Sequence, residues 1–434
     1  MAIGDRENRR RLGAVVLAVL ISQVLLYPGV PTLVTALGAP AGIDAGTAFL
    51  VAEFAAFVAF AVVWGVASDV LGRRVPLIVV GAFGGAFSYL ALAAVPRLGL
   101  GFEVALAVRV VGGALTIGAF SLAITTLMDL GGGNGRNMGT AGVAIGLGAA
   151  FGSVSGGILA DLGAFHPVYA AAAMLALSGV LAATVDDRVV AAGGDGASVV
   201  TDDPTAVDGT DRRGSRRADT DRAPEVGFRD VCSRARETPT LLVPFAFGFV
   251  DRLTAGFFAL VGVYYFQDPE TFGLSATGAG ATLALFFVPF ALLQAPFGAL
   301  SDRIGRFYPI VIGSIAYGIV TIGVGLAPIY PIAAGLMVLV GVCGALMAPA
   351  TMALVTDLVD PEARGAAMGL FNVFGSLGFL AGFLIGGGAT DAFGYTTAFL
   401  AVGGLELVIA LVLLPAVRAV VPRFEGTTRA THGD

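Results

Sequence analysis

Charged side chains interrupt several long apolar stretches of the sequence. The carboxylates among them could bind a proton. Asp251 and Arg252 are adjacent in G-F-V-D-R-L-T-A-G-F-F, Arg109 begins R-V-V-G-G, and Glu53 lies in another apolar stretch. A charge in the middle of a membrane helix costs about 2.5–3.5 kcal/mol on insertion scales, so each needs a partner or water. Burial disfavours the charged form of a carboxylate, which is the property that a proton carrier needs. We therefore expect Asp251 to carry protons, with Glu53 and then Glu406 as alternatives.

The adjacent pair of charges is expected to divide between two environments. Neighbouring helix positions diverge by about 100°, so Asp251 and Arg252 should point in different directions, one into a central cavity and one toward another helix. At about 1.5 Å per residue, Asp251 lies near the middle of its predicted span. Arg109 either contributes charge to the cavity or extends its side chain from within its span to the aqueous surface.

Two short charged segments of similar sequence also separate apolar stretches. G-V-A-S-D-V-L-G-R-R covers residues 65–74, and G-A-L-S-D-R-I-G-R repeats most of it at residues 298–306. Glycines are expected where the chain passes close to helices, and the aspartate can accept hydrogen bonds at a helix boundary. The arginines can pair with acids such as Asp129. Phe307 replaces the last arginine of the second copy, so we expect a weaker network there. The residues concerned are Gly65, Asp69, Gly72, Arg73, Arg74, Asp129, Gly298, Asp302, Gly305 and Arg306.

The elements that must position these residues are membrane helices. The chain is 56% hydrophobic and 13% charged, with a mean hydropathy of +0.87, whereas soluble domains carry roughly 25% charged residues. About 20 apolar residues cross a hydrocarbon core, and only helices satisfy their own backbone there. The predicted fold is all-α, with twelve spans near residues 12–36, 45–64, 75–95, 104–128, 139–160, 167–185, 239–266, 275–297, 308–327, 331–356, 366–389 and 396–417.

Arginine placement predicts the orientation in the membrane. All 25 basic residues are arginine, and basic residues in short loops remain cytoplasmic. With the N-terminus inside, nearly all arginines fall on the cytoplasmic side. We predict a multi-pass protein of the cell membrane with both termini in the cytoplasm.

Two cysteines and two histidines argue against a metal site, and we expect no cofactor, no nucleic acid and no enzymatic activity. A phosphate-binding loop of the G-x-x-x-x-G-K-[ST] type is absent from the sequence, which argues against ATP-driven pumping.

The sequence divides into two related halves. We assign residues 1–185 and 238–417 to two six-helix bundles, 418–434 to a cytoplasmic tail, and 186–237, rich in Asp, Arg, Gly and Thr, to a disordered cytoplasmic linker. A regulatory role for the linker stays open beside that of a tether. Parallel six-helix repeats are an architecture of secondary transporters.

Glycines recur every four residues in corresponding spans of the two halves. Such a stripe lets helix backbones touch, which is a main source of helix association in membranes. The glycines concerned are Gly139, Gly148, Gly152, Gly156 and Gly157 in the fifth span and Gly378, Gly382 and Gly386 in the eleventh.

The segment at residues 65–74 resembles the loop signature G-x-x-x-D-x-x-G-R-[RK] of the major facilitator superfamily. The resemblance covers essentially the whole chain. In that superfamily the loop connects the two halves at the cytoplasmic face when the carrier opens outward, and the resemblance implies this gate role for Asp69, Arg73 and Asp129. Arg109 resembles the arginine of an R-x-x-x-G signature in proton-coupled members.

The glycines of residues 139–157 resemble an antiporter signature of twelve-span drug/proton exchangers, although Ser153 stands where that family has proline. Family geometry places the first, fourth, seventh and tenth spans around the cavity, but the usual acid of the first span is absent. The uncharged residues expected at the substrate cavity are Gln23, Tyr27, Thr116, Phe249 and Gln294.

The sequence thus predicts a secondary active transporter that works by alternating access. Proton-coupled export of hydrophobic or amphipathic small molecules is the preferred interpretation, with a small-molecule substrate, protons or another coupling ion, and the lipid bilayer as partners of a monomer. A metabolite importer or uniporter of the same fold is the first alternative. A membrane receptor or scaffold without transport activity is the second.

Overall fold

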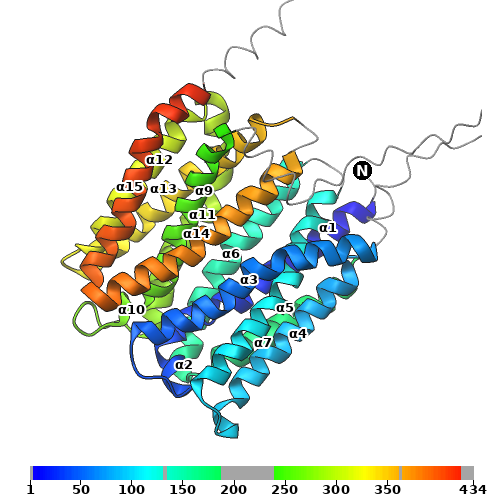
Figure 1. Ribbon diagram of the computed structural model, residues 1–434, viewed down its shortest axis with the longest axis vertical. Coiled ribbons are helices and arrows are strands. Elements are labelled where there is room, and N and C mark those ends of the chain that lie inside the picture. Colours follow the sequence, from blue (N-terminus) through cyan, green and yellow to red (C-terminus); the bar gives the residue numbers. More distant parts are fainter. Residues whose placement is uncertain (1–2, 131–133, 187–238, 361–363, 422–434) are drawn as a thin grey trace, which may run out of the picture.

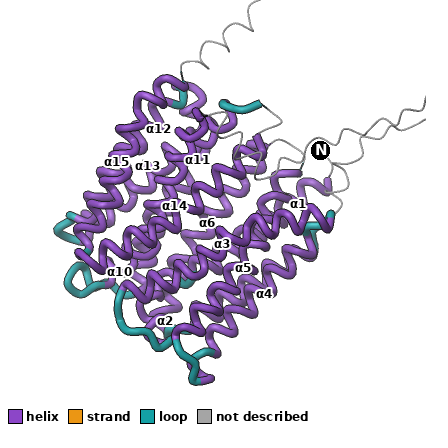
Figure 2. Tube along the Cα trace, in the orientation of Figure 1, coloured by secondary structure: helices purple, strands orange, loops and turns teal. Residues whose placement is uncertain are grey.

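The computed structural model describes residues 3–130, 134–186, 239–360 and 364–421. The described residues form helices and no strand (Figure 1 and Figure 2). Among them are twelve helical segments that are long and apolar enough to cross a membrane. The all-α prediction with twelve spans is therefore confirmed. Nearly all of the predicted linker and most of the predicted tail lie outside the described residues.

The N-terminal half contains the first six spans. The first span consists of three consecutive helical pieces, and each of the other five is a single helix. The elements are α1 (Ile3–Val24), η1 (Tyr27–Gly29), α2 (Val30–Ala36), α3 (Ile43–Leu71), α4 (Val75–Ala94), η2 (Pro96–Leu98), α5 (Phe102–Asp129), α6 (Asn134–Leu162) and α7 (His166–Ala183).

The C-terminal half contains the other six spans. Its first span changes from α-helix to a π-helical turn, η6, near its middle, and such turns are frequent at functional sites. The elements are η5 (Pro239–Leu241), α9 (Leu242–Phe257), η6 (Phe258–Gly262), α10 (Val263–Gln267), α11 (Ala276–Ile304), α12 (Phe307–Gly325), α13 (Tyr330–Asp357), α14 (Arg364–Phe393) and α15 (Tyr395–Val420).

The two ends of the molecule differ in how the halves meet. We call the end with connections 72–74, 130–133, 305–306 and 358–363 the gate end, and the end with connections 37–42, 95–101, 163–165, 268–275, 326–329 and 394 the sealed end. In Figure 1, α2 and α10 mark the sealed end and the start of α1, labelled N, marks the gate end. The halves contact each other chiefly through α6 with α11 and α3 with α14.

The glycine stripes pack against the first span of their own half. A Cβ on Gly148 would lie 2.8 Å from the Cβ of Leu20, and one on Gly152 would lie 2.9 Å from the Cβ of Val24. Gly378, Gly382 and Gly386 face α9 in the same way, through contacts with Phe249, Leu253 and Phe257. Gly156 contacts Leu25, just after the end of α1, whereas Gly157 faces Ala276 of the other half. The surroundings of Gly139 lie outside the described residues.

Replacing Gly152 by alanine should lower the stability of the protein. The added Cβ would meet the carbonyl oxygen of Ile21 at 3.1 Å as well as Val24, and overpacking a tight helix contact costs about 1–3 kcal/mol. Gly404→Ala is the matched control, because nothing lies within 4 Å of its new Cβ and alanine favours helix by about 1 kcal/mol. Melting of the detergent-purified protein should show a lower midpoint for Gly152→Ala alone. Equal midpoints for both variants would contradict the packing role.

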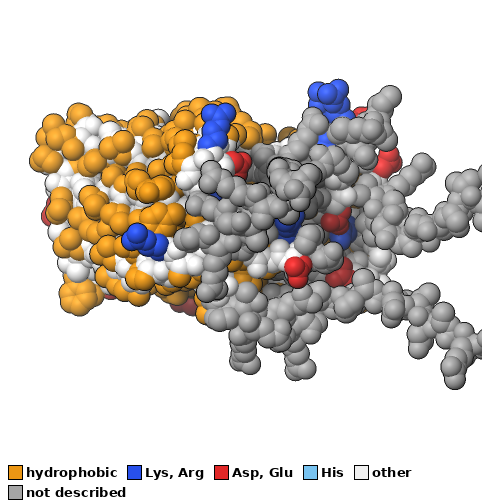
Figure 3. Space-filling view, turned by 90° about the horizontal axis from the view of Figure 1, so that it is seen from above, with side chains coloured by type: hydrophobic (Ala, Val, Ile, Leu, Met, Phe, Trp, Pro, Cys, Tyr) orange, Lys and Arg blue, Asp and Glu red, His pale blue; other side chains and the backbone are white. Residues whose placement is uncertain are grey.

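The outer surface has the apolar character that lipid contact requires. Large exposed hydrophobic side chains include Phe87 (73%), Phe151 (63%) and Val412 (69%). In the space-filling view, hydrophobic side chains cover the part away from the undescribed residues, and most charged side chains in view lie nearer to them (Figure 3). The exposed apolar surface belongs in hydrocarbon.

Candidate functional site

An accessible stripe runs along α9 from the gate end to the middle of the span. Leu242, Ala246, Phe249 and Arg252 are exposed or partly exposed, whereas the residues between them and all of 253–263 are buried. The spacing of three to four residues places the four on one side of the helix. Helices α12, α13, α14 and α15 contact α9 from within its own half. We conclude that the stripe faces the N-terminal half.

The first span of the N-terminal half has a corresponding stripe. Ala14, Leu17, Leu20 and Ile21 of α1 are partly exposed, and residues 22–30 are all buried. Helices α5, α6 and α7 contact α1 from within its own half. The two stripes form an accessible face between the halves, which opens toward the gate end and stops at Ile21 and Arg252.

Asp251 does not lie on this accessible face. Its side chain is 9% exposed and points into the C-terminal half, where Oδ1 would be 3.6 Å from a Cβ on Gly344 of α13. The neighbouring Arg252 side chain is 43% exposed, and its Nε lies 3.6 Å from Asp251 Oδ2. The prediction that the two residues separate holds. The sequence left open which of the two faces the cavity. The rotation of α9 gives the accessible side to Arg252 and turns Asp251 toward α13.

A second acid is buried with Asp251. Glu406 of α15 is fully buried, and its Oε2 accepts a hydrogen bond from Thr254 Oγ1 at 2.9 Å. Thr254 follows Asp251 by one helical turn on α9. Oε1 of Glu406 and the hydroxyl of Tyr317 on α12 have no hydrogen-bond partner among the described residues. The C-terminal half thus buries two carboxyl groups that have few hydrogen-bond partners among the described residues.

Arg109 and Glu53 pair with each other inside the N-terminal half. The guanidinium of Arg109 on α5 contacts Glu53 Oε2 on α3, and both residues are at most 4% exposed. The Cζ of Arg109 lies 4.4 Å from the ring centre of Phe49 and 5.7 Å from that of Tyr89, and Tyr89 Oη lies 3.5 Å from Glu53 Oε1. The expectation that Arg109 supplies charge to the cavity is wrong, because Glu53 already neutralises it within the bundle.

The uncharged residues predicted at the cavity divide into two groups. Phe249 lies on the accessible stripe of α9, and Gln294 of α11 is partly exposed with its Oε1 3.2 Å from a Cβ on Gly142. Gln23, Tyr27 and Thr116 are buried and do not lie on the accessible face, which corrects their assignment to the cavity. Their helix faces turn toward neighbouring helices, and a single sequence does not fix that rotation.

Within the described part of the gate end, the ion pairs of the charged side chains join residues of the same half. Arg74 bonds to Asp129 in the first half. In the second half Arg306 donates to Asp357 Oδ2 at 3.2 Å and Ser301 Oγ at 3.1 Å, and also bonds to Asp302. Arg306 thus reaches three partners among the described residues, and the weaker latch expected in the second half stays a prediction.

The other residues of the gate end are more open. Asp69 and Arg73 are exposed, and Asp69 Oδ1 accepts a 3.4 Å hydrogen bond from Ser68. Nothing lies within 4 Å of a Cβ on Gly65 or Gly72, which corrects the expected close packing there, and at Gly298 the nearest atom is 3.6 Å away. Gly72 and Gly305 instead have φ of +63° and +86°, a conformation that glycine adopts without strain.

Hydrogen bonds between side chains of one half and backbone atoms of the other join the halves at the sealed end. Asp161, at the end of α6, accepts hydrogen bonds from the first amides of α11, Ala276 N and Thr277 N, both at 3.0 Å. Gln267 Nε2 donates to the carbonyl oxygen of Pro28 at 2.9 Å. Nearer the middle of the spans, Phe54 of α3 stacks on Phe379 of α14 with ring centres 4.5 Å apart. The structure therefore represents a state that is closed at this end and accessible from the gate end.

The motifs in the sequence assigned no role to Asp161, which lies in the last turn of α6. An acid in the last turn of a helix is unfavourable for that helix, because the C-terminal end carries partial negative charge. That mismatch was the available signal that the carboxylate serves another element. In the fold it serves the N-terminus of α11, where the amides lack intrahelical partners.

Replacing Asp161 by alanine should shift the protein toward a state open at the sealed end. The variant loses two hydrogen bonds that only the closed state makes, and we expect about 1–2 kcal/mol, or a 5- to 30-fold change in the ratio of states. Spin labels at exposed Leu98 and Ile329, in a background without native cysteines, report the separation of the halves at this end. Asp391→Ala is the matched control, because Asp391 is exposed and makes no hydrogen bond to α3 among the described residues. An unchanged distance distribution for Asp161→Ala would contradict this role.

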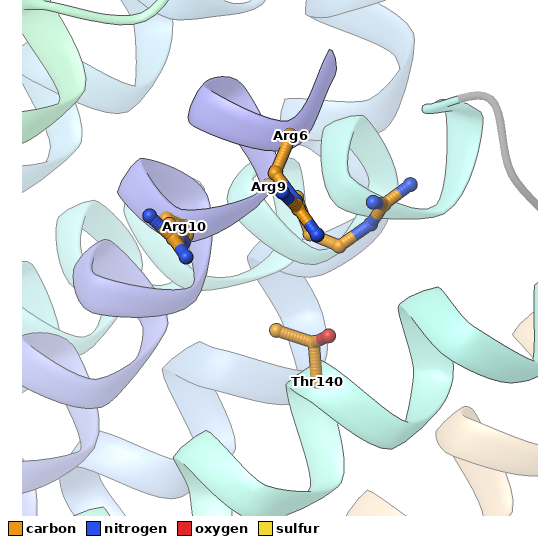
Figure 4. Close-up of a pocket in the computed structure, with 4 residues that line it drawn as sticks. All are labelled: Arg6, Arg9, Arg10 and Thr140. Carbon is orange, nitrogen blue, oxygen red and sulfur yellow. The ribbon is translucent and has the colours of Figure 1, made fainter. Parts of the chain in front are cut away.

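A small basic pocket lies at the gate end of the N-terminal half. It measures about 220 Å³ and is lined by Arg6, Arg9 and Arg10 of α1 and Thr140 of α6 (Figure 4). Arg9 is 5% exposed. The pocket belongs to the first turns of α1, ahead of the accessible stripe, so it is separate from the acids of the C-terminal half.

Comparison with known proteins identifies the fold and a family. A family model described as Major Facilitator Superfamily matches residues 12–269 and 240–432. The solved inward-facing, unoccupied structure of a bacterial homologue of the human lysosomal transporter Spinster has a TM-score of 0.75 at 14% identity, and the alignment covers 98% of this chain and 99% of that one. At that identity the likeness shows the fold alone.

Two relatives of this chain have names that indicate different functions. The multidrug efflux pump LfrA of Mycolicibacterium smegmatis is 29% identical over 30% of this chain and 26% of its own length. The niacin transporter NiaP of Acinetobacter baylyi is 27% identical over 44% of this chain and 45% of its own length. The chain thus spans less than half the length of either relative.

Proposed function

Because this chain belongs to the major facilitator superfamily, and is therefore a membrane transporter and not an enzyme, we propose that it exports hydrophobic or amphipathic small molecules by proton-coupled alternating access. The gate end faces the cytoplasm in this proposal, as the arginine distribution predicts, and the protein resides in the cell membrane as a monomer. The similarity to LfrA supports export.

One observation supports the proposal that transport is coupled to protons. Asp251 is a buried carboxyl next to the residue at which the accessible face ends. It follows Leu242 by nine residues, or about 14 Å of helix, which is near half of a ~30 Å hydrocarbon core. A proton on this group would be exposed to the gate end or the sealed end in turn, as the halves close at one end and open at the other.

The charged residues of the gate end would act in the state that is open at the sealed end and closed at the gate end. When the sealed end opens, the gate end must close, and Asp69, Arg73 and the Arg74–Asp129 pair lie where the halves would meet. Asp302 and Arg306 occupy the corresponding place in the second half. In this proposal their charges stabilise the state that is closed toward the cytoplasm.

The test is proton flux in liposomes that contain the purified full-length protein. A pH-sensitive dye inside the vesicles should report a lumenal pH change when an amphipathic substrate is added, and protein-free vesicles should give none. Opposite movement of protons and substrate supports export. Movement in the same direction would favour the importer instead, and the similarity to NiaP is the observation that keeps that candidate in view. Absence of any substrate movement across a broad panel would overturn the transport proposal and leave a receptor or scaffold.

A further inference from the structure

On the basis of the transport function proposed above, we infer that the substrate carries an anionic group and that Arg252 binds it. Arg252 would sit at the inner end of the accessible face, and the apolar part of the substrate would lie along the two stripes. The substrate class is therefore an amphipathic organic anion.

The position of Arg252 favours contact with a substrate over contact with lipid. Its helix is covered by α12, α13, α14 and α15 on the sides that belong to its own half. Farther along the same span, the side chains of Tyr264 and Gln267 approach Gly46 and Pro28 of the N-terminal half. The accessible stripe and these contacts show that the span faces the other half at both depths. Arg252 thus borders the space between the halves.

The guanidinium retains its capacity to bind an anion. Arg252 makes no hydrogen bond among the described residues, and its distance of 3.6 Å to Asp251 Oδ2 exceeds hydrogen-bond range. A guanidinium carries five N–H donors and stays charged under all ordinary conditions. A planar fork of donors fits a carboxylate, sulfonate or phosphate in bidentate geometry.

The surroundings specify the rest of the substrate. The accessible positions of α1 are Ala14, Leu17, Leu20 and Ile21, and those of α9 before Arg252 are Leu242, Ala246 and Phe249. None of these side chains is acidic, and the acid that pairs with Arg252, Asp251 at 3.6 Å, lies off the two stripes. An apolar chain attached to the anion would replace water along these side chains.

The position of the arginine is fixed by close packing. A Cβ on Gly375 of α14 would lie 3.2 Å from Arg252 Cγ. The stem of the arginine therefore rests against the bare backbone of α14, and the guanidinium extends beyond it. Sequence reasoning assigned Arg252 to one of two environments without choosing between them. The packing against Gly375 and the burial of Asp251 make the choice.

The inference is tested by equilibrium binding to the full-length protein in nanodiscs, which depends on neither a proton gradient nor a transport direction. The probes share a chain of ten carbons: radiolabelled decanoate, decyl sulfonate and decyl phosphate are the anions, and decanol and decyltrimethylammonium are the neutral and cationic controls. We expect at least one anion to bind at least about tenfold more tightly than both controls, because hydrogen bonds to charged groups are stronger than those between neutral groups.

Three variants identify the residue responsible. Arg252→Gln should lose that preference and bind all five probes alike, whereas Arg252→Lys should keep most of it because the charge remains. Arg97→Gln, at the exposed sealed end, should bind as the wild type does. Size-exclusion profiles establish that each variant is folded.

Two results would overturn the inference. One is a wild-type protein that prefers none of the anions, and the other is an anion preference that persists in Arg252→Gln. Should Arg252→Gln fail to fold, the Lys variant decides, because loss of the preference there contradicts a charge-based site. Failure of proton coupling in liposomes would leave these binding results unaffected, so the two proposals can fail separately.

Discussion

Liposomes containing the Asp251→Asn variant should show no proton flux on addition of substrate, at the level of protein-free vesicles, while downhill exchange of substrate continues. Asparagine preserves the shape of the side chain but cannot take up or release a proton at working pH. In the wild type the carboxyl is buried beside Gly344, so it must exchange its proton as the halves move. The decisive measurement is substrate movement with and without an imposed pH gradient.

The matched control for this variant is Glu103→Gln. Glu103 lies exposed in the first turn of α5, so the loss of its charge should leave gradient-driven movement unchanged. An Asp251→Asn protein that still follows the gradient would exclude Asp251 as the carrier. Glu406 would then be the next candidate, because it is buried in the same half and bonded only to Thr254 among the described residues. Glu53 is a weaker candidate, since Arg109 already holds it.

Removing one partner of the Arg109–Glu53 pair should destabilise the protein by about 3–5 kcal/mol, because an uncompensated charge remains buried. The two single variants should differ in severity. After Arg109→Met, Glu53 can neutralise itself by taking up a proton, whereas after Glu53→Leu the guanidinium of Arg109 has no such route. We therefore expect Glu53→Leu to lower the melting midpoint in detergent more than Arg109→Met.

The double variant distinguishes a structural pair from a coupling pair. Arg109→Met combined with Glu53→Leu removes both charges, and apolar replacement of a buried pair is often neutral or stabilising. The double variant should therefore recover most of the stability that either single variant loses, and it should still move substrate along a pH gradient. A stable Arg109→Met protein that had lost its response to the gradient would instead place Arg109 in the coupling machinery.

The membrane topology could be predicted from the sequence because its causes are local. Whether a stretch spans the bilayer depends on its own length and hydropathy, and the backbone in lipid must bond within the stretch. The twelve spans follow from that rule. The charged repeats near Asp69 and Asp302 mark corresponding ends of related helices, and the structure places both at the gate end. The glycine stripe of Gly148, Gly152 and Gly156 could likewise be predicted, because a period of four gives one helix face.

The partners of the buried charges could not be predicted, since they depend on how each helix is rotated and which helices are neighbours. Arg109 meets Glu53 because α3 and α5 pack together, and nothing in either segment alone specifies that contact. The rotation of α9 about its axis decides whether Asp251 or Arg252 lies on the accessible face. The sequence established that the two side chains point in different directions, and packing against α14 settled which side each takes. The closed state of the sealed end has the same origin. It depends on Asp161 meeting the first amides of α11, two elements that come together only when the halves assemble.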